Sequence, residues 1–220
     1  VQRETMERGA TLMRLAKSHL RIGHFEHFYH RNDHEHLRGM IEFAINQLDP
    51  DLVELPDRVE QAFQRYIERS AQLMGHWMAV GFVHGVMNTD NMSIHGLTID
   101  YGPYGWIEDF DPNWTPNTTD ANTLRYRFGH QPRIVLWNIA RLLEAISPLV
   151  ENRSILQEKI NSAQDKMAHS HEKMWVNKLG LKQYDEELIQ QLVELMYHDK
   201  VDMTMFFRLL SSLSKPELHQ

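Results

Sequence analysis

The sequence contains no cysteine, which excludes disulfide bonds and thiolate metal sites and fits a reducing compartment. No apolar run reaches about eighteen residues, so we expect no membrane-spanning helix, and the chain does not open with a secretion signal. Positive charge is also scarce, because 23 Lys and Arg stand against 30 Asp and Glu, for a formal net charge of −7. Since binding to duplex nucleic acid depends on cationic contacts to phosphates, this balance argues against a nucleic-acid partner.

The remaining composition is that of an ordinary globular domain, and its apolar residues recur mostly at the spacing of one helix face. We therefore predict a mainly α fold, a helical domain with a small β-hairpin. Asp57, with Glu60 three positions on, predicts a capping box at one helix start. The first predicted helix follows Asn32-Asp33 and ends at Asp49-Pro50, and the second starts at Asp57 and stops at Gly81. A third starts at Pro132 and runs through 134–146, and a fourth covers 155–174 with Gly180 beyond. Two more are predicted, one after Asp185 and one over 206–213.

The pattern changes between these helices. Two short apolar runs, 92–94 and 97–99, flank His95-Gly96, which is typical of a two-stranded hairpin. Residues 102–131 are rich in Gly, Pro, Asn, Asp and aromatic side chains and have no periodicity, so we predict a long ordered loop.

The run HGVMNTDN at residues 84–91, followed nine positions later by D-Y-G, carries the candidate chemistry. Asn91 and Asp100 are oxygen ligands of the kind that hold Mg²⁺ on a nucleotide, and protein kinases use the same order of Asn and then Asp. Alignment with the kinase signature H-R-D-x-x-x-x-N puts Val86 where kinases have their catalytic Asp. The usual base is missing, and an acidic side chain stands instead at Asp90. Taken alone, Asn91 and Asp100 could equally cap local turns.

Three longer stretches stand out: 4–28 (ETMERGATLMRLAKSHLRIGHFEHF), 84–112 (HGVMNTDNMSIHGLTIDYGPYGWIEDFDP) and 126–142 (YRFGHQPRIVLWNIARL). They resemble the selenoprotein O family, whose bacterial members are protein adenylyltransferases on a pseudokinase fold. The resemblance covers the chain to about residue 145, and more loosely to its end. It implies a protein-kinase-like C-terminal lobe of a longer protein, in which the N-terminal lobe, with its glycine-rich loop and Lys/Glu pair, precedes Val1.

The resemblance also implies an organisation of the chain. Within a single lobe spanning residues 1–220, residues 1–31 would form the lobe junction that contacts the nucleotide. Residues 84–102 would form the catalytic loop and the metal hairpin, and residues 132–220 a helical subdomain.

The same resemblance assigns roles to individual side chains. Asp90 would be the general base, Arg14 and Arg21 would clamp phosphates, and Asn91 and Asp100 would hold Mg²⁺ or Mn²⁺, with Asp100 also at the nucleotide. The alternatives are a structural carboxylate at Asp90 that orients Asn91 or binds a second metal, and arginines that are simply solvated.

The function implied is transfer of AMP from ATP to Ser, Thr or Tyr hydroxyls of proteins in the bacterial cytoplasm. An ordinary phosphotransferase is one alternative, against which Val86 argues. A non-catalytic, kinase-like scaffold is another, against which the Asn91/Asp100 pair argues. Without the N-terminal lobe, we expect this segment to be inactive by itself.

The histidines have simpler interpretations than a metal site. His24, His27 and His30 are three positions apart, but no H-E-x-x-H pattern accompanies them, so we do not expect zinc. We place His24 in a turn over residues 23–26. His84 heads the kinase-like loop, where we expect a packing and hydrogen-bonding role.

Overall fold

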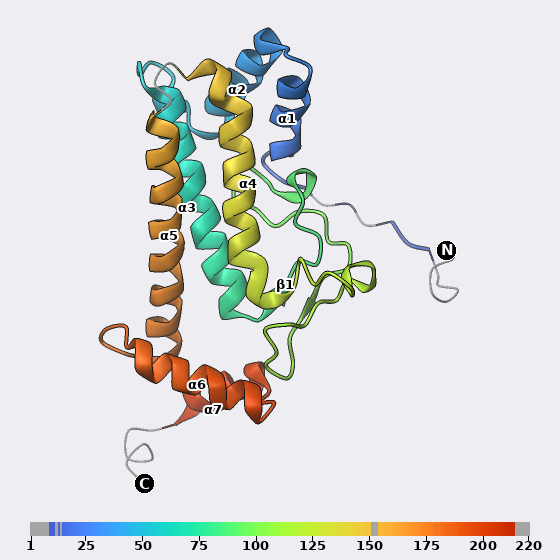
Figure 1. Ribbon diagram of the computed structural model, residues 1–220, viewed down its shortest axis with the longest axis vertical. Coiled ribbons are helices and arrows are strands. Elements are labelled where there is room, and N and C mark those ends of the chain that lie inside the picture. The colour runs from blue at the N-terminus through green and yellow to red at the C-terminus, as the bar shows by residue number, and fades with distance from the viewer. Residues whose placement is uncertain (1–8, 12, 14, 151–153, 214–220) are drawn as a thin grey trace.

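The computed structural model describes residues 9–11, 13, 15–150 and 154–213 (Figure 1). The described chain is mainly helical, as predicted from the apolar periodicity. Helices α3, α4 and α5 run along the length of the molecule, with α1 and α2 at one end and α6 and α7 across the other. The helices are α1 (Ile22–His30), α2 (His34–Leu48), α3 (Arg58–Ala79), α4 (Gln131–Ile146), α5 (Ser154–Leu179), α6 (Glu186–His198) and α7 (Met203–Ser212).

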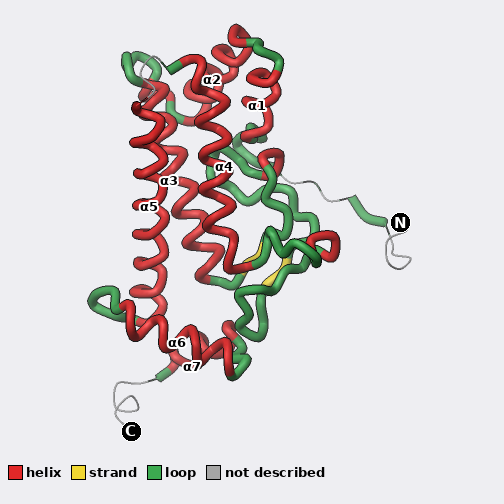
Figure 2. The backbone as a smooth tube through the Cα atoms, viewed as in Figure 1, coloured by secondary structure: helices red, strands yellow, loops and turns green. Residues whose placement is uncertain are grey.

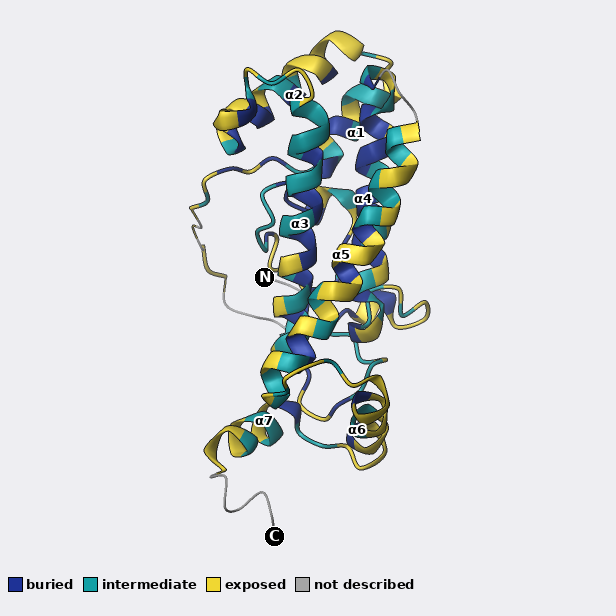
Figure 3. Cartoon of the chain, turned by 90° about the vertical axis from the view of Figure 1, so that its left-hand side faces the viewer, coloured by how far each residue is buried: buried dark blue, intermediate teal, exposed yellow. Residues whose placement is uncertain are grey.

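Helices α3 and α5 lie side by side and run parallel, because residues that contact each other advance together along both. Gln64 Nε2 donates to Ser162 Oγ at 3.2 Å near their starts, and Lys178 Nζ donates to the Ala79 carbonyl at 2.5 Å near their ends. Their buried faces point inward, toward α4 (Figure 3). The main hydrophobic core therefore lies among α1 to α5, and a smaller cluster attaches the long loop to α6 and α7.

Most helix ends lie where the sequence predicts them. Asp33 precedes α2, and its carboxylate accepts a hydrogen bond from His36 N at 3.2 Å, which satisfies one of the free N–H groups of the first turn. Gly81, just beyond α3, has φ +69°, the left-handed conformation that ends many helices. Within the described residues, no helix is both long and apolar enough to cross a membrane.

Two local predictions are wrong. The capping box at Asp57 does not form, because the Asp57 carboxylate accepts from Gln61 Nε2 at 3.0 Å instead of from the backbone. The turn that we placed at residues 23–26 lies within helix α1, so His24 is helical.

The predicted hairpin turns back as expected but forms no continuous ladder. One bridged pair, Met92 with Thr98, joins its two arms, and the turn closes through Gly96 N, which donates to the Ser93 carbonyl at 3.2 Å. The outer edge is instead taken by the segment before α1, where Ile22 N donates to the Met92 carbonyl at 3.1 Å. The first arm of the hairpin, residues 92–94, thus lies between the segment before α1 and the second arm.

The strands of the described chain lie just outside this hairpin, within the region drawn mostly as loop in Figure 2. Strand β1 (Phe82–Val83) precedes the kinase-like loop and pairs antiparallel with β2 (Gly105–Trp106). The long segment over 102–131 is ordered, as predicted, and is built from β2 and short 3₁₀ turns. Together, the Met92–Thr98 bridge and the β1–β2 pair bring the segments before and after Asp100 back to the kinase-like loop.

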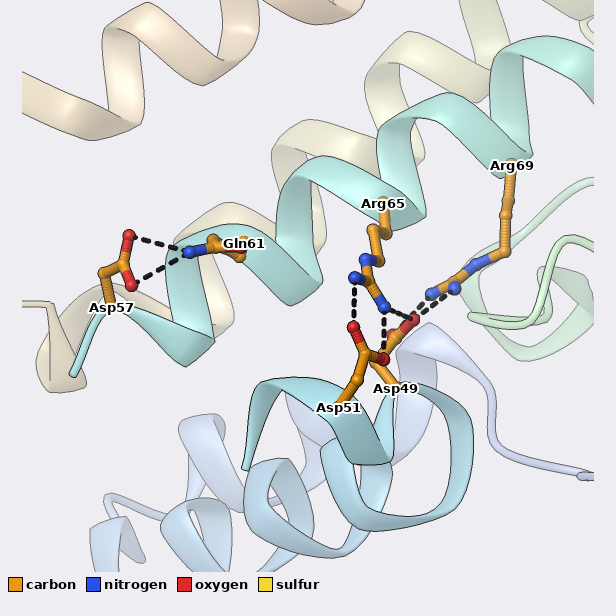
Figure 4. A network of polar contacts seen from close by, with 6 residues as sticks. All are labelled: Asp49, Asp51, Asp57, Gln61, Arg65 and Arg69. Carbon is orange, nitrogen blue, oxygen red and sulfur yellow. Dashed lines mark hydrogen bonds and ion pairs between the residues drawn. The ribbon is translucent and has the colours of Figure 1, made fainter. Parts of the chain in front are cut away.

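An ion-pair network between the end of α2 and helix α3 supports the turn of the hairpin (Figure 4). Asp49, at the end of α2, is 5% exposed and pairs with Arg65 and Arg69 of α3. The Arg69 backbone and Cβ lie against Gly96, where an added Cβ would be 2.7 Å from Arg69 Cβ. The turn of the hairpin therefore rests on α3 at the point where α3 is joined to α2.

Candidate nucleotide and metal site

His84 links the kinase-like loop to the segment that carries Asp100. Its ring is 1% exposed, its Nε2 lies 2.7 Å from the Ile99 carbonyl, and its Nδ1 accepts from Val86 N at 3.4 Å. Both contacts are satisfied by a neutral ring protonated on Nε2, and burial lowers the pKa of His84, which favours that neutral form. The expected packing and hydrogen-bonding role of His84 is confirmed.

Asp100 follows directly and has an unusual backbone conformation. Its φ is +54°, in the left-handed region that costs a non-glycine residue about 1 kcal/mol or more and that is often found at functional sites. Gly102 N donates to the Asp100 carbonyl at 2.7 Å, which holds the bend. The carboxylate is exposed and makes no hydrogen bond or ion pair with the described residues, so it is free to bind a cation.

Asn91 faces inward and is oriented by the loop that precedes it. It is 8% exposed, and its Nδ2 donates to the Val86 carbonyl at 3.1 Å. With Nδ2 engaged in this bond, Oδ1 is the atom that remains for a metal. An amide oxygen and a free carboxylate fit Mg²⁺ or Mn²⁺, which take oxygen ligands. No group of three or more His, Asp or Glu side chains in the described chain could hold a metal by itself, so phosphates and water would complete the coordination.

Three buried amide side chains hold the backbone of the loop, and none of them was predicted from the sequence. Gln131 accepts from His84 N at 3.0 Å and donates to the Phe82 carbonyl at 2.8 Å. Asn138 donates to the Met87 carbonyl and Asn117 to the Gly85 carbonyl, each at 2.9 Å. Gln131 and Asn138 lie on α4, and their polar side chains within a largely apolar helix are the sequence signal that could have indicated this supporting role.

The indole ring of Trp77, on α3, also contributes to the site. It packs against His84 with ring centroids 5.5 Å apart, and its Nε1 donates to Thr98 Oγ1 at 2.9 Å. Helix α3 therefore holds the second arm of the hairpin from behind.

Asp90 lies in the 3₁₀ turn Thr89–Asn91, on the side facing the start of α1. Its carboxylate is exposed and, like that of Asp100, has no hydrogen-bond partner in the described part of the chain. Partial desolvation lowers the pKa of His24, and Arg21 lowers it further, whereas the nearby Asp90 carboxylate acts to raise it. Asp90 thus stands beside the first turn of α1, while its neighbour Asn91 faces the interior.

The two arginines assigned as phosphate clamps are placed unequally. Arg14 lies outside the described residues. Arg21 bridges Ser93 through the backbone, so it belongs to the segment alongside the hairpin. Its backbone N donates to His24 Nδ1 at 3.1 Å, and its Nε is buried without a hydrogen-bond partner among the described residues.

Comparison with known proteins supports the family that these residues indicate. The family model described as protein adenylyltransferase SelO matches residues 1–220. The chain belongs to this family. Among curated SelO-family relatives, it is similar to proteins named protein nucleotidyltransferase YdiU from Flavobacterium johnsoniae (44% identical), Rhodopirellula baltica (46%) and Xanthomonas oryzae (46%).

These matches cover nearly the whole chain but less than half of each relative. They include 96% of this chain and 41% of the Flavobacterium protein, 94% and 40% for the Rhodopirellula protein, and 96% and 42% for the Xanthomonas protein. The SelO-family chain therefore spans about two fifths of the length of the curated relatives that it matches.

Proposed function

We propose that this chain forms the metal- and phosphate-binding part of a protein adenylyltransferase, which transfers AMP from ATP to a Ser, Thr or Tyr hydroxyl of a protein. The observation that carries the proposal is the bond from His84 to the Ile99 carbonyl, because it ties the loop that ends in Asn91 to the residue before Asp100. Family membership and the names of the relatives support nucleotidyl transfer.

In this proposal, Asn91 through Oδ1 and Asp100 through its carboxylate hold Mg²⁺ or Mn²⁺. The metal, when bound, neutralises charge on the phosphates and orients them. Arg21, together with Arg14, binds phosphate oxygens through the bidentate geometry of the guanidinium group.

Asp90 acts as the general base. It accepts the proton of the substrate hydroxyl while the hydroxyl oxygen forms a bond to the α-phosphorus of ATP. The bond between that phosphorus and the oxygen bridging to the β-phosphate breaks, and pyrophosphate leaves. General-base assistance of this kind contributes roughly 10²–10⁴-fold. An exposed Asp90 carboxylate without a partner in the described chain suits this role.

We also propose that the helical domain is a kinase-like C-terminal lobe, completed by an N-terminal lobe that covers the nucleotide. The order of a catalytic-loop Asn and a later Asp supports this assignment. In this proposal, the N-terminal lobe would carry the glycine-rich loop and the Lys/Glu pair.

The test uses the full-length protein and ATP labelled separately at the α- and γ-phosphates, with a substrate-protein mixture. Protein that carries α-label supports the proposal. Protein that carries γ-label would identify an ordinary phosphotransferase, and protein without either label would favour a scaffold. The matched control is Asp90→Asn, which keeps the shape of the side chain and removes its basicity, so α-labelling should be lost while ATP binding persists.

A further inference from the structure

Gly23 occupies the second position of α1 and lies directly against the Asp90 side chain. A Cβ added at Gly23 would overlap Asp90 Oδ1 and would be 3.0 Å from Asp90 Cγ, which is closer than most real Cβ contacts. The Asp90 Cα would be 3.6 Å away, which is an ordinary contact. The Asp90 carboxylate therefore occupies the space that any larger residue at position 23 would need.

The conformation of Gly23 does not itself require glycine. The glycines with positive φ in the described chain are Gly81, Gly85, Gly96 and Gly180, whereas Gly23 has an ordinary helical backbone. Glycine in a helix is less favourable than alanine, because it loses more backbone freedom on folding. Contact with Asp90 is the feature of the structure that accounts for glycine at this position.

Helix α1 is anchored and cannot easily move away from Asp90. The Ile22 side chain is fully buried and Phe25 is 3% exposed. Glu26 accepts from Arg141 Nε of α4 at 2.7 Å, and Ile22 N is bonded to the hairpin. The Asp90 side chain, in contrast, is exposed and turns about single bonds. A methyl group at position 23 would therefore displace the carboxylate and leave both backbones in place.

We propose that Gly23 is a positioning residue for Asp90, since the missing side chain at the start of α1 leaves the space in which the carboxylate is held. This inference rests on the proposed role of Asp90 as general base. A displacement of a reacting group by about 1 Å can cost roughly 10²-fold in rate. Substitution at Gly23 should thus reduce turnover without altering any group that touches the substrate.

The experiment compares Gly23→Ala with Gly39→Ala in the full-length protein. Gly39 is a matched control, because it also lies in a helix, α2, and a Cβ added there meets nothing within 4 Å. For Gly23→Ala, we expect kcat for AMP transfer to fall about 10²-fold, with the KM for ATP unchanged and the melting temperature no lower. Gly39→Ala should raise the melting temperature and keep normal turnover. Normal turnover in Gly23→Ala would overturn the inference.

A second measurement covers the case in which Gly23→Ala also loses stability. Gly23→Ala is placed in an Asp90→Ala background, and the melting temperatures of the four proteins form a double-mutant cycle. If the carboxylate fills the space, Gly23→Ala raises the melting temperature more in that background than in the wild type. Equal changes in both backgrounds would refute the contact. This cycle remains informative if the wild-type protein transfers no AMP, so failure of the proposed function and failure of the inference are distinguished.

Discussion

Removal of the Asp49 carboxylate should destabilise the fold far more than removal of its exposed neighbour. Asp49 accepts hydrogen bonds from Arg65 Nη1 at 3.1 Å and from Arg69 Nη1 and Nη2 at 3.0 and 3.2 Å. Figure 4 shows both guanidinium groups reaching it from α3. Arg65 has a second partner in Asp51, but Asp49 is the one carboxylate in the described residues that pairs with Arg69. Asp49→Ala thus leaves Arg69 without a counter-charge.

The magnitude follows from burial. Breaking a buried ion pair by removing one partner costs about 3–5 kcal/mol, because the other charge stays desolvated. The Arg65 and Arg69 side chains are 37% and 24% exposed, so water can compensate part of that loss. We therefore expect Asp49→Ala to reduce the free energy of unfolding by about 3 kcal/mol, or roughly a hundredfold in the folding equilibrium.

Urea denaturation measures this difference, with Asp51→Ala as the matched control. Asp51 pairs with Arg65 at 2.5 Å, but its side chain is 62% exposed, and exposed pairs contribute less than about 1 kcal/mol. Because Arg69 supports Gly96, Asp49→Ala should also speed hydrogen exchange of the Gly96 amide. Equal losses of stability in the two variants, or a loss below about 1 kcal/mol for Asp49→Ala, would refute the reasoning.

Four further outcomes are expected. Asp100→Ala should abolish metal-dependent AMP transfer while the melting temperature is kept, and normal transfer would disprove the metal assignment. Asp90→Asn should lower kcat by roughly 10²–10⁴-fold with little change in ATP binding, whereas parallel loss of both would indicate a metal or structural role. Arg21→Lys keeps the charge but loses the bidentate geometry, so the Kd for ATP should rise about ten- to hundredfold in a titration. Burial holds the pKa of His84 below 6.5, so the unfolded chain binds a proton that the folded chain does not, and stability should fall as the pH drops below about 6.5. In His84→Gln the slope of unfolding free energy against pH should be smaller, by at most about 1.4 kcal/mol per unit, and an unchanged slope would contradict a neutral buried His84.

The sequence predicts the long helices because their signals are local. Helices α2, α3, α5 and α6 combine an apolar stripe with a cap or a stop within a few residues, such as Asp33 before α2 and Gly180 after α5. Those signals need no knowledge of partners. Asp185 is another such local signal, because it caps the start of α6 and its carboxylate accepts a hydrogen bond from Leu188 N at 3.0 Å.

Helix α1 lacks such signals, and this is why it was missed. It is nine residues long, and its inner face consists of little more than Ile22 and Phe25 among several histidines. The residue before it is Arg21, which is not one of the residue types that cap a helix start, so the sequence gives no sign of a helix here. A helix this short is marginal by itself, so its stability comes from contacts with α4 and the hairpin. Such contacts cannot be predicted from a local pattern.

The candidate site divides in the same way. The motif predicts the packing and hydrogen-bonding role of His84, which the structure confirms, whereas the metal-binding roles of Asn91 and Asp100 stay predictions. The supporting amides could not be assigned, since Gln131 and Asn138 bond to backbone groups 47 to 51 positions away. Their polar side chains in an apolar helix indicate that partners exist, but not which partners. The phosphate contacts of Arg14 and Arg21 stay predictions.

The candidate site separates the groups that hold the loop from the two carboxylates to which we assign a metal-binding and a general-base role. Behind the loop, the bonds come from buried neutral groups, namely the His84 ring and the amides of Gln131 and Asn138, so no charge is desolvated to fix the backbone. In front, the carboxylates of Asp90 and Asp100 are exposed and lack partners within the described chain. Loss of a supporting group therefore leaves a buried partner unsatisfied and should reduce stability and turnover together. Loss of either carboxylate should reduce turnover with little loss of stability, because neither makes a hydrogen bond or ion pair within the described chain.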